Sequence, residues 1–390
     1  MNRFEEDGDE PCEYQITAGN AGWRSQFRFA VHVLWSRAPE FRTLGGATMK
    51  RFSVLILLAA VSAMSAPSGV TGTNDNEGVK WHPGHYAFVQ SSPLDESYLY
   101  KNFQGIEKCY EWRTLEPQKD HYDFSTIRSD LAFLCKHGKR LVIQIQTKAF
   151  APGQNCCPDY IKGVYKTRWG SFNPMIWDER VNQRLMMLYQ QLGKEFDQEP
   201  SLEAMVIPET AITGEVVTQS EVPYTVDIYT RSVEAGMQAM KDAFPHTVII
   251  QYVNMPLESI QPLADYAKTH GIGFGGPDIY PYDSMLNNPQ KGVYRLYPML
   301  AGLVPLGAAV QPNDYSQKGA FRASPGAATV KEIYDFGRDK LRLNYIFWSI
   351  RKDYFEKVQV MMDEAAFPKD AAGGLNKTFP TSIAGKIKKE

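Results

Sequence analysis

The chain has 390 residues, of which 43% are hydrophobic, and a formal net charge of −2. These values describe a soluble globular protein with enough apolar side chains for a large core. Lys and Arg are scattered along the sequence, which excludes a basic stretch for nucleic acid, and the short GKIKKE end is interpreted as a solvated tail.

Residues 49–66 are predicted to be a secretory signal peptide. From Met49 the chain reads MKRFSVLILLAAVSAMSAPSG, with two positive charges, an apolar stretch and then small residues. The apolar stretch at residues 52–64 is shorter than the about 20 residues that span a bilayer, so no membrane contact is expected after cleavage. We therefore expect a periplasmic or secreted protein. Residues 1–48 are interpreted as a non-native or disordered N-terminal extension with the true start at Met49, or else as a long n-region of the signal.

Eight short apolar runs, each closing on a polar or aromatic residue, follow in the rest of the chain. They are HYAFVQ, GIEKCYEW, RLVIQIQ, LEAMVIPET, TVIIQYVN, IGFGGPDIY, LGAAVQ and NYIFWS. Strand-like runs alternating with helix-like segments are typical of an α/β fold, the (β/α)8 TIM barrel. An open doubly wound sheet is the rival layout, but eight units favour closure. We expect a linker at 67–83, a single barrel domain at 84–367 and a C-terminal tail at 368–390.

Helices and loops are expected between these runs. Apolar residues recur at helical spacing from Ser125, in 181–192 and in 226–240, and later units are expected at 257–270, 293–303, 328–341 and 354–365. These apolar stripes are interpreted as core. A long loop at 150–176, rich in Pro, Gly, Cys, Tyr and Trp, is longer than a connector requires, and such loops often line sites.

The residues at the ends of the eight runs form the candidate site, because the chemistry of such barrels lies at the carboxyl ends of the strands. They are Gln90, Glu111, Gln146, Glu209, Asn254, Asp278, Gln311 and Trp348. Strand alternation predicts that Glu209 shares an inward face with Met205 and Ile207, and Asp278 with Phe274 and Gly276. The same count places Gln144 with Gln146, Asn254 with Tyr252, and Gln311 with Ala309.

Glu209 and Asp278 are the predicted catalytic pair. A carboxylate above an apolar core and partly shielded by loops has a raised proton affinity, which suits a general acid. Glycoside hydrolysis uses two carboxylates flanking the bond, and strands two apart leave room between them for a water, which favours inversion. The alternative for Glu209 is a structural ion pair or helix cap, and the reserve acids are Glu111, Glu215, Asp283 and Asp314.

The segment YEWRTLEPQKDHYDFSTIRSDLAFLCKHGKRLVIQIQ, at residues 110–146, resembles the second and third units of clan A glycoside hydrolases, the cellulase-like and β-galactosidase-like barrels. The resemblance rests on Trp112, on LEP at 115–117 and on YDFS at 122–125. By strand order it extends over most of 86–364, and Trp348 is similar to the last-strand aromatic of the clan. The chain also resembles secreted bacterial barrel proteins of unassigned activity that carry PETA, GGPD and AVQ segments.

The resemblance implies roles for two strand ends. The clan places its acid/base glutamate at the end of strand four, commonly after asparagine, which corresponds to Glu209 with Pro208 in place of the asparagine. The clan nucleophile is a glutamate ending strand seven, where this chain has Gln311. An amide cannot act as a carboxylate nucleophile, so this departure puts the retaining mechanism in doubt, and Gln311 is expected to bind a sugar hydroxyl or a water.

Aromatic residues and one arginine complete the predicted substrate site. Trp112, Tyr280 and Trp348 are expected to stack on sugar rings, with core packing as the alternative. Trp169, Tyr160, Trp177 and Tyr282 are further aromatic candidates. Arg113 could orient an acidic sugar, although a salt bridge with Glu111 or Glu116 is the plainer role.

Other motifs are interpreted as structural. Cys109, Cys135, Cys156 and Cys157 permit disulfides without indicating a pairing, and neither they nor the histidines of WHPGH have the spacing of a metal site. GIGFGG at 271–276 lies between a helix and PDIYPYD, whereas a dinucleotide fingerprint needs a strand before it and a helix after it. No metal or other cofactor is expected.

These observations predict an exported glycoside hydrolase acting on an oligo- or polysaccharide, with Glu209 as acid and Asp278 as base through water. Two alternatives stay open. A non-catalytic carbohydrate-binding barrel would explain Gln311, and a polysaccharide lyase-type barrel enzyme would use Arg113. The sequence does not indicate the sugar, the linkage or the oligomeric state.

Overall fold

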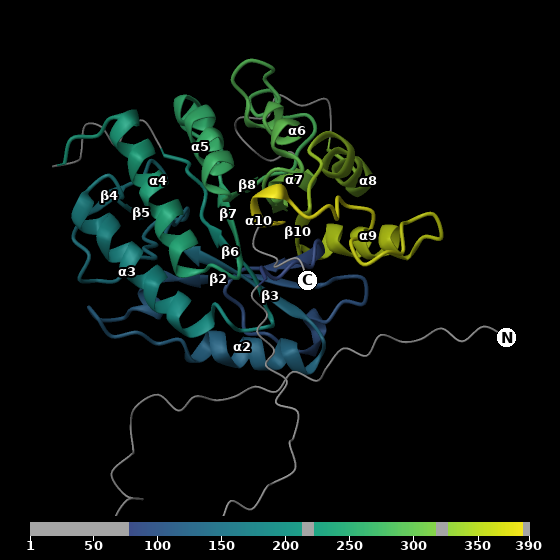
Figure 1. Cartoon of the computed structure of the whole chain (residues 1–390), viewed down its shortest axis with the longest axis horizontal. Coiled ribbons are helices and arrows are strands. Elements are labelled where there is room, and N and C mark those ends of the chain that lie inside the picture. Colours follow the sequence, from purple (N-terminus) through teal and green to yellow (C-terminus); the bar gives the residue numbers. More distant parts are fainter. Residues whose placement is uncertain (1–77, 213–221, 317–326, 385–390) are drawn as a thin grey trace, which may run out of the picture. The chain divides into compact units, whose positions relative to one another are not determined.

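The computed structural model describes residues 78–212, 222–316 and 327–384 (Figure 1). The predicted signal peptide at 49–66, the extension at 1–48 and Glu215 lie outside these ranges. Among the described residues, no helix combines the length and the apolar character needed to cross a membrane.

Eight parallel strands close into a barrel. Seven lie within one predicted run each, and β1 begins one residue before its run HYAFVQ. In spatial order they are β1 (Gly84–Val89), β10 (Tyr345–Ser349), β9 (Leu306–Val310), β8 (Gly273–Gly276), β7 (Val248–Tyr252), β6 (Leu202–Ile207), β3 (Arg140–Gln146) and β2 (Gly105–Glu111). β1 pairs with β10, so the sheet has no open edge. The (β/α)8 prediction is confirmed, and the open doubly wound sheet is excluded.

Helices surround the strands in Figure 1. The longer ones are α2 (Ser125–Lys136), α3 (Glu179–Phe196), α4 (Val226–Ala243), α5 (Leu257–His270) and α9 (Lys352–Asp363), and α8 (Val330–Asp335) continues into the π-helix η4 (Phe336–Lys340). The short ones are α1 (Trp112–Leu115), α6 (Tyr297–Leu300), α7 (Pro312–Ser316), α10 (Thr381–Ala384) and the 3-10 turns η1 (Glu96–Tyr98) and η3 (Val293–Arg295). The unit expected at 293–303 is therefore only η3 and α6.

Side-chain caps explain where several helices begin. The side chains of Asp178 and Thr225 accept hydrogen bonds from backbone N–H groups in the first turns of α3 and α4. Thr329 and Glu332 form a capping box at the start of α8. The long loop expected at 150–176 contains the antiparallel hairpin β4 (Val164–Lys166) and β5 (Phe172–Pro174).

The barrel interior is a packed core made of alternate strand residues. Its buried cluster includes Tyr86, Phe88, Val142, Ala204, Val206, Val248, Ile250, Tyr252, Ala309, Tyr345 and Phe347. Glycines allow the narrow approach of β8 and β9, because a Cβ on Gly275 would lie 2.1 Å from the Gly307 carbonyl oxygen. This close pairing requires glycine at these positions of both strands.

The amino-terminal end of the barrel is closed by both flanking segments. Val79 and Ile383 belong to the core cluster, and Trp81 and Phe379 pack against it. The described parts of the expected linker at 67–83 and tail at 368–390 therefore pack on the barrel. His82 also has a structural contact here, since its backbone N–H and its Nδ1 lie 2.6 and 2.7 Å from the Glu203 carboxylate.

Candidate active site

Four polar residues from neighbouring strand ends meet at the carboxyl end of the barrel. Lys148 follows β3, Glu209 follows β6, Asn254 follows β7 and Asp278 follows β8, each by two residues. Three of these, Glu209, Asn254 and Asp278, were predicted from the sequence. Lys148 was missed because it lies beyond the last polar residue of its run, and its only signal was a lysine directly after a buried strand.

Glu209 is held by Asn254. The Asn254 Nδ2 group donates to Glu209 Oε2, while Asn254 Oδ1 accepts from the backbone N–H of Met255 at 2.9 Å. Because a backbone N–H can only donate, this second contact sets the orientation of the amide. The Glu209 carboxyl therefore has a fixed donor on one side.

Burial raises the pKa of Glu209 above the usual value of a glutamate. The positive charge of Lys148 opposes this rise, the negative charge of Asp278 adds to it, and the hydrogen bond from Asn254 opposes it. Desolvation disfavours a carboxylate, and a nearby like charge does the same. The site thus contains a carboxyl group biased toward its protonated form, with a second carboxylate and a cation close by.

Lys148 is a buried cation at this site. The residue is 6% exposed, and its Nζ donates to the carbonyl oxygen of Ala211 at 2.5 Å. Burial lowers the pKa of Lys148 to about 8, and the charge of Glu209 opposes that fall. Below about pH 8, where Lys148 is charged, its ammonium group can stabilise the ionised state of Glu209.

Asp278 is partly exposed, and its main chain is anchored by a tyrosine. The Tyr294 hydroxyl donates to the Asp278 carbonyl oxygen at 3.1 Å and accepts from the Tyr280 N–H at the same distance. The charge of Asp278 helps to raise the pKa of Glu209 and of buried Tyr297. The structure therefore brings both predicted carboxylates into one electrostatic environment.

The predicted strand faces are wrong at both acids. On β6 the inward residues are Ala204 and Val206, so Met205 and Ile207 face the helices. On β8 the Phe274 ring packs against Tyr297 of α6, with ring centroids 5.5 Å apart. Both strands end two residues before the acid, and the alternation rule does not extend into the turn that follows. By contrast, Tyr252 and Ala309 lie in the core as expected.

Three predicted stacking residues are fully buried. Trp112, Tyr280 and Trp348 have 0% exposure, so none offers a ring face to a sugar in this structure. Trp112 Nε1 donates to Glu116 Oε2 at 2.9 Å, and Trp348 Nε1 donates to His85 Nδ1 at 2.9 Å. Trp348 points away from the barrel axis because its neighbour Phe347 points inward.

The other predicted strand-end residues remain accessible. Gln90 is exposed, and Glu111, Gln146 and Gln311 are partly exposed. The Gln146 side chain donates to the carbonyl oxygen of Lys148, which ties the end of β3 to the turn that carries the lysine.

Arg113 has partners other than those expected. Its guanidinium donates to the Asn155 carbonyl oxygen at 3.0 Å and to the exposed Asp159 carboxylate, while Glu116 pairs with Arg184 of α3. The long loop thus holds Arg113 through two contacts.

Two reserve acids have structural contacts. Asp283 accepts from the backbone N–H groups of Met285 and Leu286. Asp314 has 0% exposure and accepts from the N–H groups of Gln311 at 2.6 Å and Ile279 at 3.3 Å. A carboxylate therefore lies next to the end of β9, but it is turned toward the backbone.

Exposed aromatic rings lie on the loop that follows β3. Phe150 and Trp169 are 44% and 39% exposed, and their ring centroids are 6.0 Å apart. The Arg168 guanidinium lies 4.4 Å from the Trp169 ring. Of the aromatic residues that the sequence suggested for sugar stacking, Trp169 keeps an open ring, whereas Trp177 is buried.

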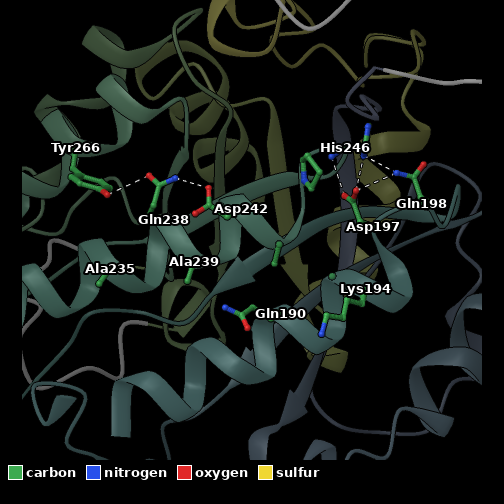
Figure 2. A pocket seen from close by; sticks show the side chains of 13 residues that line it. Gln190, Lys194, Asp197, Gln198, Ala235, Gln238, Ala239, Asp242, His246 and Tyr266 are labelled. Atoms are coloured by element: carbon green, nitrogen blue, oxygen red, sulfur yellow. Dashed lines mark hydrogen bonds and ion pairs between the residues drawn. The ribbon is translucent and has the colours of Figure 1, made fainter. Parts of the chain in front are cut away.

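Two cavities differ in their relation to these residues. The larger, about 860 Å³, lies between the last turns of α3 and α4 and is lined by polar groups such as Asp197, Gln238 and His246 (Figure 2). Those turns lead into the starts of β6 and β7, so this groove lies away from the mouth. The smaller cavity, about 40 Å³, is lined by Lys148, Glu209 and Gln251.

No cluster of His, Cys, Asp and Glu side chains in the described part of the chain has the arrangement of a metal site. No protein-family model matches the chain, and no curated protein matches it.

Solved structures similar to this chain include an endo-glycoceramidase and xylanases. A lactosyl-enzyme intermediate of endo-glycoceramidase II from Rhodococcus sp. has a TM-score of 0.48 and 13% identity, covering 71% of this chain and 74% of that chain. Xylanase 10B from Thermotoga petrophila RKU-1 with xylobiose has a TM-score of 0.44 and 14% identity, covering 69% and 82%.

Proposed function

We propose that this chain is a glycoside hydrolase in which Glu209 is the general acid. The observation that carries the proposal is the Glu209 carboxyl itself, held by Asn254 at the end of a barrel strand, with its pKa raised by burial and by Asp278. A carboxyl group whose pKa is raised holds its proton more readily than an ordinary glutamate and can donate it to a departing glycosidic oxygen.

Asp278 is proposed as the base. A water deprotonated by Asp278 attacks the anomeric carbon, the bond to the glycosidic oxygen breaks, and Glu209 protonates that oxygen as it leaves. The products are a sugar with inverted anomeric configuration and an alcohol. The charge of Lys148 then stabilises the Glu209 carboxylate. Gln311 at the end of β9 supports inversion, since an amide cannot form the covalent intermediate of a retaining enzyme.

The substrate is proposed to be an oligo- or polysaccharide. Phe150 and Trp169 offer exposed rings on the loop after β3, and aromatic rings stack on the apolar faces of sugars. Together with the signal-like segment at 49–66, this favours a protein that is exported and meets its glycan in the periplasm or outside the cell.

Leaving-group dependence tests the role of Glu209. Glu209→Gln should lower kcat by about 100-fold or more on 4-methoxyphenyl glycosides, whose leaving group needs a proton. The same variant should keep most of its activity on 2,4-dinitrophenyl glycosides, which leave without protonation. Equal losses on both substrates would remove Glu209 from the acid role, and full activity on both would remove it from the site.

The anomeric configuration of the first-formed sugar tests the second carboxylate. Proton NMR during hydrolysis should show inversion at the anomeric carbon. Asp278→Asn should abolish hydrolysis, because the attacking water loses its base. A retained configuration would instead point to a nucleophile such as Glu111, which is partly exposed at the end of β2.

A non-catalytic carbohydrate-binding barrel is the second candidate, favoured by Gln311 at the nucleophile position. Saturable glycan binding without product release would establish that alternative.

A further inference from the structure

Gln251 is a buried amide on the outer face of β7, behind Glu209. It is 1% exposed, and its neighbours Ile250 and Tyr252 point into the barrel core. Its Nε2 donates to the carbonyl oxygens of Pro208 at 2.9 Å and Tyr252 at 2.8 Å. Because carbonyl oxygens only accept, both contacts require the amide nitrogen at this position, and the orientation of the side chain is set.

The oxygen atom of this amide has no hydrogen-bond donor within the described part of the chain. Gln251 Oε1 is buried and accepts no hydrogen bond from any residue in the described ranges. Leaving a buried acceptor without a donor is destabilising, so such atoms are normally satisfied by protein or by ordered water. Gln251 lines the 40 Å³ cavity together with Lys148 and Glu209. That volume admits a water molecule, for which about 15 Å³ is enough, but not a sugar ring.

We propose that Gln251 is a positioning residue for Glu209, holding the Pro208 carbonyl through Nε2 and an ordered water in the cavity through Oε1. The Pro208 carbonyl belongs to the peptide group that joins Pro208 to Glu209, so this bond sets the direction in which the acid leaves the strand. Because Glu209 lines the same cavity, this water can solvate its carboxylate. The inference deepens the proposed function, because its purpose rests on Glu209 acting as the acid.

The ionisable groups around Glu209 come from four elements. Lys148 and Asp278 act on its pKa from the ends of β3 and β8. Tyr165 of β4 and Tyr229 of α4 are near enough for the charge of Glu209 to raise their own pKa. Burial raises the pKa of both tyrosines far above neutral pH, so neither adds a charge next to Glu209 in that range.

Gly236 provides a second way to remove the water. It lies in α4 and lines the same cavity, and a Cβ built on it meets no atom within 4 Å. A methyl group is similar in size to a water molecule, so Gly236→Ala should displace the water while leaving Gln251 in place. Ala is also favoured over Gly in the interior of a helix, so this variant should fold.

Carboxyl titration and a crystal structure test the proposal on the full chain without any substrate. In ¹³C-glutamate-labelled protein, with the Glu209 signal assigned from Glu209→Gln, both Gln251→Leu and Gly236→Ala should raise the pKa of Glu209 by about one pH unit, because the carboxylate loses solvation. Thr230→Val is the matched control, since it removes a buried hydroxyl bonded to Ser259 at 2.7 Å, and it should cause no change.

Two results would overturn the proposal. One is high-resolution density that shows no water within hydrogen-bond distance of Gln251 Oε1. The other is a Glu209 pKa that stays constant in Gly236→Ala or moves equally in Thr230→Val. If the titration behaves as expected but no glycoside is hydrolysed, the positioning role stands and only the proposed function fails.

Discussion

Glu107 inside the barrel makes the pH dependence of stability testable. It lies on β2, has 0% exposure and accepts a hydrogen bond from the Tyr252 hydroxyl at 3.0 Å. Its Oε2 has no partner among the described residues. Burial raises the pKa of Glu107 from 4.5 to about 8, while the bond from Tyr252 opposes that rise. The native state therefore carries a protonated Glu107 at neutral pH.

The raised pKa determines the sign of the effect. Below pH 4.5 Glu107 binds its proton in both the native and the unfolded state, so the stability linked to this group is fully present. As pH rises toward 8 only the native state keeps it, and the free energy of unfolding falls by about 1.4 kcal/mol per pH unit. Between about pH 5 and pH 8 the wild type should lose about 3 kcal/mol more stability than Glu107→Gln, whose side chain is neutral in both states.

Urea unfolding at several pH values measures this difference directly. Using the difference between the two proteins cancels the contributions of Glu209, Lys148 and every other group that is common to both. The Gln variant should have the flatter profile and should be relatively more stable at pH 8. Parallel profiles for wild type and Glu107→Gln would refute the reasoning, because they would mean that Glu107 has the same pKa in the folded and unfolded chain.

Three further changes have expected outcomes. Asp278→Asn should lower the pKa of Glu209 by removing the charge that helps to raise it, which carboxyl titration would detect as a shift to lower pH. Lys108→Met should destabilise the fold by about 3 kcal/mol, measured by urea unfolding, because it leaves the buried Asp130 carboxylate without its cation at 2.6 Å. Thr329→Ala should cost about 1 kcal/mol in the same assay through loss of the α8 cap, and a loss near zero would show that the cap is dispensable.

The sequence predicted the strands well because a strand buried on both faces is a continuous apolar run. Each of the eight runs corresponds to one barrel strand, and the polar residue after it lies where the chemistry of such barrels occurs. That pattern was enough to bring Glu209, Asn254 and Asp278 to one site. It did not predict Lys148, because a single lysine in a loop has no local pattern that separates a buried cation from a solvated one.

The structure distinguishes buried from exposed aromatic residues, which the sequence could not do. Trp112 and Trp348 are fully covered, whereas Trp169 is open. A tryptophan has the same local preference in each setting, so the packing of neighbouring elements decides the difference. The same is true of Arg113, whose partner Asp159 lies in the long loop and not in the adjacent strand end.

By itself, the sequence determined the barrel, its eight strands and the two acids at strand ends, because apolar periodicity encodes which segments must be buried. Only the tertiary structure decided that Lys148 and Asn254 act on Glu209, that Asp314 turns toward the backbone, and that Gln251 lies behind the acid. These contacts join residues far apart in the chain, and their energies depend on burial and on distances that exist only once the barrel has closed.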